Sequence, residues 1–458
     1  MIAAATAAAA ATAAAATNLP LPGEISAGDT AWMLAATALV LMMTPALGLF
    51  YAGLVRAKNT LNTFMMCVGA LGVVTVMWAV IGYSLAFDRG NGFVGGLHYA
   101  FLQGVTLGPR AGLHIPHLLF FAFEATFCIV TSALVSGAVV ERMRFGPFLI
   151  FMGIWSVVVY AVLAHWVFGG GWLAHHGTLD FAGGVPVEMA SGFSAFAAAR
   201  LVGARHDYGR QALLPHNAVY VLLGAGLLWF GWFGFNGGSG YSTGSSSVLA
   251  FTNTLLAPAC ALVVWFGLDL LRDRRVTAIG GATAIIVGCV AITPAAGYIS
   301  PTWAMLLGAL AALPSYAIIL WRPRTRLDET LDVLAAHGVA GMTGMLFIGF
   351  FAQVAWNGTA NGLLYGHPAQ LLWQAVAVLA APAYAFTATF VILRVIGLFT
   401  RLRVTEREEA IGMDVIQHGE EAYTTGEGAI LVGPEDGFEA DAGRRFGERI
   451  FGPVSKSS

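Results

Sequence analysis

The chain has 458 residues, of which 57% are hydrophobic and only 10% are charged. A soluble globular domain carries about 25% charged residues, so this composition excludes an ordinary soluble fold and indicates a polytopic membrane protein. The formal net charge of −2 does not favour a nucleic-acid partner, and the four cysteines lack the spacing of metal ligands, so we expect neither a metal site nor a cofactor.

The first 29 residues precede any long apolar run, and nearly all of the first seventeen are Ala or Thr. No Lys or Arg precedes this stretch, so the positive start of a typical signal peptide is missing. A cleaved signal and a disordered leader are therefore both open interpretations of residues 1–29, which we separate from the membrane domain.

Eleven apolar runs follow, each long enough to cross a hydrocarbon core, which takes about 20 residues of helix. The expected spans are 31–54, 62–87, 117–140, 146–168, 181–203, 216–236, 248–271, 277–298, 302–321, 333–356 and 370–398. They predict an all-α integral membrane domain over residues 30–402. Residues 403–458 are polar and contain no such run, so they are expected to form a cytoplasmic tail.

Basic residues between the spans give the orientation, because cytoplasmic loops are enriched in Lys and Arg. Only Arg89 and Arg110 flank one side. The other side has Arg56, Lys58, Arg142, Arg144, Arg200, Arg205, Arg210, Arg272, Arg274, Arg275, Arg322, Arg324, Arg326, Arg401 and Arg403. The N-terminus is therefore expected outside and the C-terminus inside, which requires an odd number of spans. Five spans, five inverted ones and a last helix fit the inverted-repeat plan of many transporters.

Two ionisable residues are expected near the middle of the membrane, Glu188 in the fifth span and His337 in the tenth. Because matching spans of inverted repeats run antiparallel, these side chains are expected to lie side by side. An ionisable group at that depth is a functional-site hypothesis by default. Asp180 and Asp332 stand where the two segments start and are expected to accept N–H bonds from the first helical turn.

Ordered motifs along the chain resemble the ammonium transporter (Amt/Mep/Rh) family, in particular its bacterial Amt-like members. They are LFYAGLVRAKN at 49–59, DFAGG at 180–184, GWFGFN at 231–236, TPAAGY at 293–298, HGVAG at 337–341 and HGEEAY at 418–423. The resemblance covers roughly residues 30–425. It implies a protomer of eleven helices, a homotrimer with one pore in each subunit, and conduction of ammonium nitrogen across the inner or plasma membrane of a cell.

The resemblance also implies roles for residues on the outer side of the pore. Phe127, Phe168 and Ser239 match an ammonium-recruiting site made of aromatic rings and a hydroxyl group. Phe127 and Phe235 match two stacked phenylalanines that gate the pore. Position 168 is Trp in the best-known members, and Phe is the poorer partner of a cation, so weaker recruitment is expected. Glu124 beside the gate faces either the vestibule or a partner on another helix.

The centre of the pore departs from the family pattern. Most members have two histidines there, whereas this chain has Glu188 at the first position and His337 at the second, a replacement similar to that of fungal branches. A carboxylate beside an imidazole can share one proton, so we expect this pair to relay protons. By resemblance, Asp180, Asp332 and Thr293 are structural supports and not ligands.

The expected function is ammonium transport and not enzyme catalysis, since the chain has no nucleotide-binding loop and no nucleophile elbow. Two alternatives remain open: an ammonium sensor with little flux, and a channel for neutral ammonia gas. The expected partners are ammonium or ammonia, the lipid bilayer, two further copies of the chain, and a PII-type signal protein at the cytoplasmic face. In the tail, Glu420 and Glu421 are expected to pair with Arg205, Arg210 and Arg322.

Overall fold

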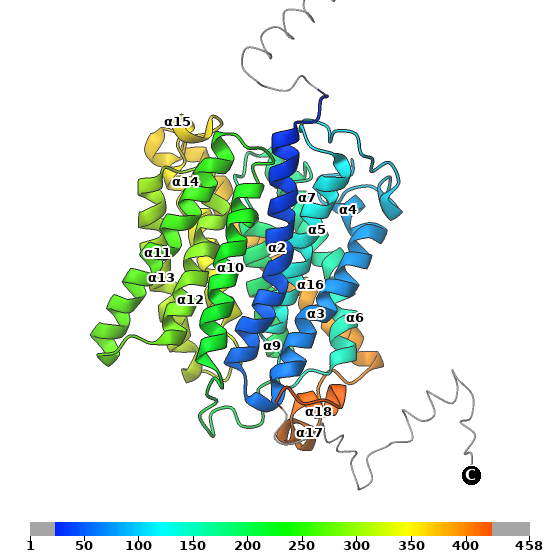
Figure 1. The fold of residues 1–458 in the computed structure, drawn as a ribbon, viewed down its shortest axis with the longest axis vertical. Helices are drawn as coiled ribbons and strands as arrows, with labels where there is room; N and C mark the ends of the chain where they lie inside the picture. Colours follow the sequence, from blue (N-terminus) through cyan, green and yellow to red (C-terminus); the bar gives the residue numbers. More distant parts are fainter. Residues whose placement is uncertain (1–22, 424–458) are drawn as a thin grey trace, which may run out of the picture.

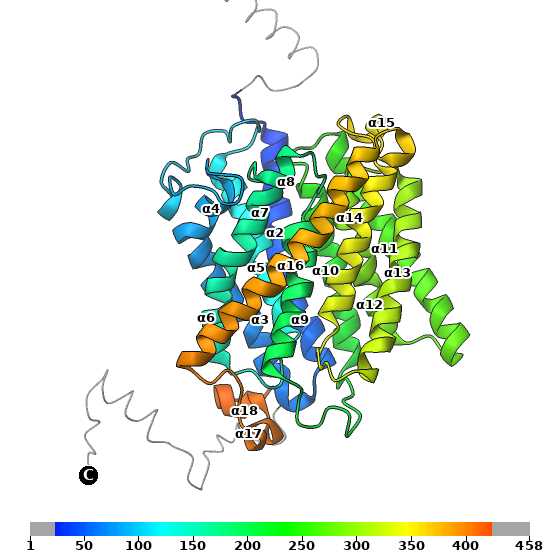
Figure 2. The same cartoon turned by 180° about the vertical axis from the view of Figure 1, so that it is seen from behind.

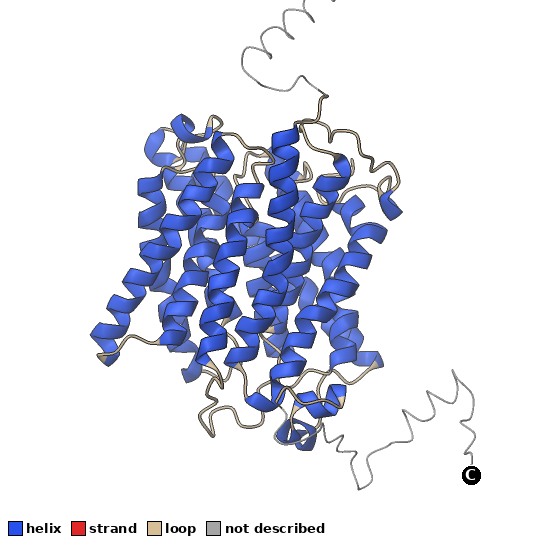
Figure 3. Ribbon diagram, viewed as in Figure 1, coloured by secondary structure: helices blue, strands red, loops and turns tan. Residues whose placement is uncertain are grey.

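A computed structural model describes residues 23–423 and shows a bundle of roughly parallel and antiparallel helices (Figure 1). Every regular element in that range is a helix, as the composition predicts (Figure 3). The expectation for the leader falls largely outside the described range, as does the expectation for the tail beyond Tyr423.

The bundle is built from long helices, several of which contain a turn of π-helix. The α-helices are α2 (Ala27–Leu54), α3 (Thr60–Met77), α4 (Tyr83–Phe87), α5 (His117–Ser136), α6 (Phe145–Trp155), α7 (Ala161–Val167), α9 (Ala190–Val202), α10 (Ala218–Gly238), α11 (Ser245–Asp273), α12 (Ala278–Ile292), α13 (Pro301–Trp321), α14 (Ala340–Phe351) and α16 (Pro368–Phe399). The π turns are η2 (Trp78–Gly82), η4 (Ser156–Tyr160), η5 (Gly184–Met189) and η8 (Leu334–Val339). Two short helices, α8 (Trp172–His175) and α15 (Val354–Asn357), lie at the outer ends.

Ten helices in the described range are long and apolar enough to cross a membrane, and each coincides with an expected span. The remaining expected span, 181–203, corresponds to η5 followed by α9. This helix contains Glu188 and Arg200, which lower its mean hydropathy, and nearly all of its residues are buried among other helices. It packs against α5, η8 and the oblique helix α16 (Figure 2). The eleven expected spans are therefore all present as helices.

The two inverted halves meet at the centre, where η5 and α9 cross η8 and α14. Glycines allow this close approach: a Cβ atom on Gly192 would lie 2.3 Å from the backbone nitrogen of Gly338. Likewise, a Cβ atom on Gly341 would lie 2.6 Å from the Cβ atom of Glu188. Gly192 follows Glu188 by four residues and Gly341 follows His337 by four, so each ionisable residue has a glycine one turn later on the same face. This equal spacing is what an inverted repeat predicts.

The described part of the chain ends shortly after two short helices beneath the cytoplasmic side of the bundle, α17 (Glu406–Ile411) and α18 (Met413–His418) (Figure 1). Thr405 and Glu408 form a reciprocal capping box that starts α17. Gly412 separates the helices with φ of 127°, a backbone conformation that favours glycine. The described part of the tail is therefore a folded unit that packs against α3 and the turn before it.

Candidate functional site

A cavity of about 200 Å³ lies in the cytoplasmic half of the bundle. Its mouth includes Leu213 and Pro215 of the loop between α9 and α10, together with Arg322 and Asp332. Its walls are largely apolar side chains of α2, α5, α10 and α12. The inner end reaches Glu188, His337 and Phe235, so the cavity connects the centre of the membrane domain to the cytoplasmic surface.

Glu188 and His337 lie in direct contact at this inner end. The Oε2 atom of Glu188 is 2.8 Å from the Nδ1 atom of His337, and both side chains are buried. The other carboxylate oxygen of Glu188 has no hydrogen-bonding partner in the described part of the chain, although it is buried. A buried carboxylate oxygen without a hydrogen bond is unfavourable, and a substrate or a water molecule in the cavity can donate the missing hydrogen bond.

On the outer side, the carboxylate of Asp180 fixes the start of η5. Its Oδ1 atom accepts hydrogen bonds from the N–H groups of Gly183 at 2.9 Å and Gly184 at 2.7 Å. Its Oδ2 atom accepts one from Val185 at 2.7 Å. Gly183 has a φ of 116°, which brings these N–H groups round to a single side chain. The carboxylate of Asp180 thus satisfies three N–H groups at the start of η5.

On the cytoplasmic side, the expectation for Asp332 is wrong in its detail. Glu329 is the residue that accepts hydrogen bonds at the start of η8, from the N–H groups of Val333 at 2.9 Å and Leu334 at 3.1 Å. Asp332 has a φ of 58° and forms an ion pair with Arg322 at the cavity mouth. A carboxylate directed toward a guanidinium in this way is not available to the helix start, so Asp332 supports the mouth.

Two aromatic rings close the inner end of the cavity. The centroids of Phe127 and Phe235 are 4.0 Å apart and their planes are inclined by 28°, so the rings are stacked. Both side chains are almost fully buried. Phe123 packs against Phe127 at a centroid distance of 4.8 Å. The structure thus places the two expected gate residues together.

The other two expected residues of the outer site, Ser239 and Phe168, do not form a contact like that between Phe127 and Phe235. Ser239 donates its hydroxyl hydrogen to the carbonyl of Phe235 at 2.8 Å, which leaves the oxygen lone pairs to accept an N–H group. Phe168 caps the end of α7 and is only partly buried. No aromatic ring in residues 23–423 stacks on it, and the structure does not bring its ring against Phe127. Glu124 accepts a hydrogen bond from the hydroxyl of Tyr241 at 2.6 Å, so it has a helix partner.

Thr293 is hydrogen-bonded to Trp232, a cavity-lining residue that was not among the expected site residues. The indole Nε1 of Trp232 donates to the Oγ1 atom of Thr293 at 2.8 Å, and Thr293 donates in turn to the carbonyl of Cys289 at 2.9 Å. Thr293 is fully buried, while Trp232 lines the cavity beside Phe235. The sequence did contain an indication of this residue, because Trp232 belongs to the same motif, GWFGFN, as the expected gate residue Phe235.

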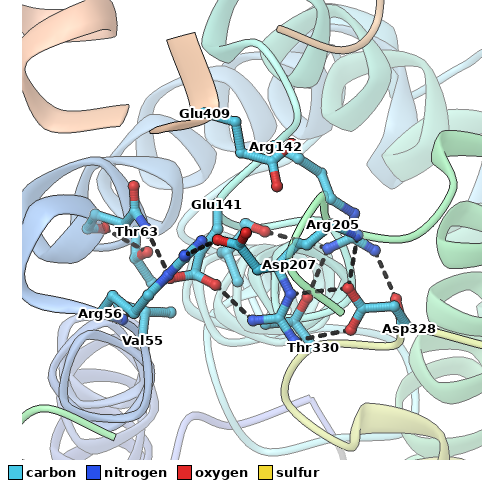
Figure 4. A network of polar contacts seen from close by, with 12 residues as sticks. Val55, Arg56, Thr63, Glu141, Arg142, Arg205, Asp207, Asp328, Thr330 and Glu409 are labelled. Atoms are coloured by element: carbon cyan, nitrogen blue, oxygen red, sulfur yellow. Dashed lines mark hydrogen bonds and ion pairs between the residues drawn. The ribbon is translucent and has the colours of Figure 1, made fainter. Parts of the chain in front are cut away.

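A network of ion pairs joins the cytoplasmic ends of the helices (Figure 4). Glu141 accepts hydrogen bonds from Arg56 at 2.9 Å and also pairs with Arg205. Arg205 is paired in turn with Asp328 at 2.8 Å. Burial by itself would raise the pKa of Glu141 and of Asp328, but the neighbouring guanidinium groups hold both pKa values below their usual range. The loops after α5 and α9 are therefore tied to the segment that leads into η8.

The tail is docked by acids other than those expected. Glu409 accepts from the N–H of His206 at 2.8 Å and pairs with Arg403 at 2.8 Å. Asp414 accepts the N–H groups of Leu61 at 3.0 Å and Asn62 at 2.8 Å, at the start of α3.

The predicted pairing of Glu420 and Glu421 with cytoplasmic arginines is wrong. Arg205 is already paired with Glu141 and Asp328, and Arg322 is paired with Asp332. Both glutamates are exposed and belong to no ion pair in residues 23–423. The folded tail places Glu409 and Asp414 nearer to the membrane domain.

Comparisons with known proteins agree on one family. Residues 31–423 match the family model described as Ammonium Transporter Family. An ammonium transporter of Bacillus subtilis is 42% identical over 400 residues, which cover 86% of this chain and 98% of that one. An ammonium transporter of Aquifex aeolicus is 42% identical over 404 residues and covers 87% of this chain and 94% of its own.

Solved structures are similar over the same range. The crystal structure of Candida albicans Mep2 has a TM-score of 0.80 and 35% identity, and the match covers 84% of this chain and 88% of that one. A structure described as a sensor Amt protein has a TM-score of 0.80 and 27% identity, and covers 85% of this chain and 98% of its own.

Proposed function

This chain belongs to the ammonium transporter family, and from that premise we propose that it moves ammonium nitrogen as ammonia plus a proton. The observation that carries this mechanism is the contact of 2.8 Å between Glu188 and His337 at the inner end of a cavity that opens to the cytoplasm. The two groups form a proton-exchanging pair at a depth where an ionisable residue is otherwise costly.

Recruitment occurs on the outer side of the stacked phenylalanines. Phe127, Phe168 and the hydroxyl of Ser239 receive the ammonium ion, with the rings facing the cation and the oxygen accepting an N–H group. Each favourable ring contact contributes about 0.5 to 2 kcal/mol. The free lone pairs of Ser239 support this role.

The stacked rings of Phe127 and Phe235 select against hydrated ions. A stack with a centroid distance of 4.0 Å leaves no space for an ion with its water shell. Moving a charge without water into an apolar constriction is very unfavourable, whereas neutral ammonia passes at far lower cost. Ammonium therefore releases its proton near the gate.

The proton crosses by way of Glu188 and His337. A proton arrives at the unpartnered Oε1 atom of Glu188 as the proton on Oε2 passes along the hydrogen bond to Nδ1 of His337, and the imidazole releases its other proton from Nε2. Nδ1 is the only ring nitrogen of His337 with a partner among the described residues, which leaves Nε2 to exchange a proton with the cavity. Net transport is electrogenic in this scheme.

Replacement of Glu188 by Gln tests the relay. Electrical recording on proteoliposomes should show that Glu188→Gln loses most of the ammonium-driven current, by at least about tenfold, because an amide does not exchange protons. The matched control is Asp269→Asn, which alters a buried carboxylate of α11 that does not line the cavity. A full current in Glu188→Gln would refute the relay, provided that the variant elutes like the wild type.

The same recordings separate the alternative functions. A sensor would bind ammonium with little flux, an alternative supported by the similarity to a sensor Amt protein. A gas channel would raise the internal pH of the proteoliposome without a current. A current that scales with the ammonium gradient is the outcome expected here.

Two further proposals concern the oligomeric state of the protein and its partner at the cytoplasmic face. We propose a homotrimer in the inner or plasma membrane, in accordance with the family. We also propose that a PII-type signal protein inserts a loop into the cavity mouth between Arg322 and the loop containing Leu213.

A further inference from the structure

The last turns of α16 present an arginine to the lipid side of the bundle. Ile392, Leu393 and Ile396 are buried, whereas Val391, Val395 and Leu398 are exposed at 53%, 47% and 80%. Arg394 is exposed too and belongs to this outward stripe, since it lies three residues after Val391 and four before Leu398. A guanidinium in an apolar stripe needs a polar partner at the level of the headgroups.

Arg394 and its neighbour Arg401 have no such partner among the residues that the structure describes. Neither side chain forms a hydrogen bond or ion pair with any of residues 23–423. By contrast, the nearby Arg403 is paired with Glu409 at 2.8 Å. Among residues 23–423, two guanidinium groups without an ion pair therefore stand at the cytoplasmic end of α16, where the other exposed residues between 390 and 399 are apolar or glycine.

The same residues line one groove. It runs between the end of α9, at Leu201 and Val202, and the end of α16, and it contains Arg394, Arg401 and Leu398. Figure 2 shows α16 crossing this face obliquely and ending near the tail helices. With 32 residues α16 is about 48 Å long, which exceeds a hydrocarbon core of about 30 Å, so its end reaches the cytoplasmic interface.

We propose that this groove binds an anionic phospholipid of the cytoplasmic leaflet. The phosphate of the headgroup lies between Arg394 and Arg401, and guanidinium groups recognise phosphate oxygens through paired N–H donors. The acyl chains follow Val395 and Leu398 along the outer face of α16. A zwitterionic lipid of the same chain length lacks the net negative charge and binds more weakly.

Native mass spectrometry of the full-length protein, stripped of lipid in detergent, can measure this preference. The probes are phosphatidylglycerol and phosphatidylcholine with identical acyl chains. The first phosphatidylglycerol should bind more tightly than phosphatidylcholine, and Arg394→Gln and Arg401→Gln should each weaken it by about fivefold. Binding of phosphatidylcholine should be unchanged in both variants, and Arg394→Lys should retain most of the preference because it keeps the charge.

Arg275→Gln is the matched control. Arg275 is also exposed, cytoplasmic and without an ion pair in the described residues, but it lies in the loop after α11 on the far side of the bundle (Figure 2). An equal loss in Arg275→Gln would show a general effect of net charge and overturn the proposal. So would an unchanged lipid preference in the Arg394→Gln, Arg401→Gln double variant, or complete competition by inorganic phosphate at the lipid's concentration. If Arg394→Gln does not fold, Arg401→Gln, which lies outside the helix, decides the question alone.

Discussion

The two segments that carry Glu188 and His337 start in similar ways but are stabilised differently. On the outer side η5 depends on one carboxylate, Asp180, which accepts three N–H groups and has no cationic partner in the described residues. On the cytoplasmic side η8 starts on Glu329, and ion pairs of Asp328 and Asp332 surround it. The outer start therefore rests on a single side chain, whereas the cytoplasmic start is stabilised by several.

This difference fits the positions of the two segments. The outer start is fully enclosed by other helices, so a few short hydrogen bonds are enough to satisfy its N–H groups. The cytoplasmic start lies beside the cavity mouth, where the loops after α5 and α9 and the tail also meet. Stability there is shared among many charges, so it depends on pH and on each of the connected loops. Substitutions at Asp180, Glu141 and Glu329 test this contrast, and one at Glu188 tests the chemistry between the two segments.

The largest effect is expected for Asp180→Ala. Hydrogen bonds to a charged group contribute about 1.5 to 3 kcal/mol each, so losing all three should destabilise the protein by more than about 3 kcal/mol and abolish transport. Thermal unfolding in detergent and the ammonium-driven current measure the two effects. Asp180→Asn should be intermediate, because the amide oxygen can still accept the bonds from Gly183 and Gly184. Wild-type stability in Asp180→Ala would show that η5 does not depend on this side chain.

Glu141→Gln should have the next largest effect, about 3 kcal/mol, because it leaves the buried Arg205 with one partner fewer. The effect should depend on pH. Since the pKa of Glu141 is lower in the folded protein than its ordinary value of 4.5, the wild type gains stability above that pH and loses it as the pH falls through the lowered pKa. The difference in unfolding temperature between wild type and variant should therefore be constant from pH 7 to about 5 and shrink below 4.

The control for Glu141 is Asp273→Asn, which removes an exposed pair with Arg272 at 3.7 Å. Exposed pairs contribute about 0 to 1 kcal/mol, so this variant should behave like the wild type at every pH. A difference of the same size for Asp273→Asn would mean that total charge, and not the buried network, sets the stability.

Glu329→Gln should cost less, about 1 to 2 kcal/mol. It weakens two N–H contacts, and the ion pairs of Asp328 and Asp332 remain to hold the segment. The appropriate comparison is with Asp180→Asn, the matching amide on the outer side, by thermal unfolding under the same conditions. If Glu329→Gln proved the more damaging of the two, the contrast between a single support and a shared one would be wrong.

The smallest effect is expected for Glu188→His, which makes the two halves of the pore chemically alike. A carboxylate at the pore centre stabilises any cation without its water shell better than a neutral imidazole does. The variant should therefore discriminate better against potassium, within about tenfold, with little change in stability. Currents in potassium and ammonium gradients measure the ratio, and unchanged or lower selectivity would contradict the expectation.

Features that follow from local composition or from the inverted repeat were the easiest to place. The eleven apolar runs predicted the spans, because a segment of about 20 apolar residues has no other stable arrangement in a bilayer than a helix. Glu188 and His337 occupy matching positions in the fifth and tenth spans, and matching spans of an inverted repeat run antiparallel. The sequence therefore also predicted that the two side chains would be neighbours, as they are.

Contacts between loops were not predictable in this way. Glu141, Arg205 and Asp328 come from three segments separated by more than 60 residues each, and no local pattern indicates which charges will meet. The same limit explains the errors in the tail and at Asp332: several acids lie near several arginines in the sequence, and the choice among them depends on backbone direction.

The sequence by itself determined the membrane class, the number and place of the spans, and the presence of two ionisable residues, Glu188 and His337, in the fifth and tenth spans. Each of these follows from the cost of exposing polar groups to lipid, which acts on every residue according to its own chemistry. Only the tertiary structure decided that Glu329 and not Asp332 starts η8, that Glu409 and Asp414 dock the tail, and that Arg394 and Arg401 share a groove. Those choices depend on distances and directions between segments far apart in the chain, which are set when the helices pack.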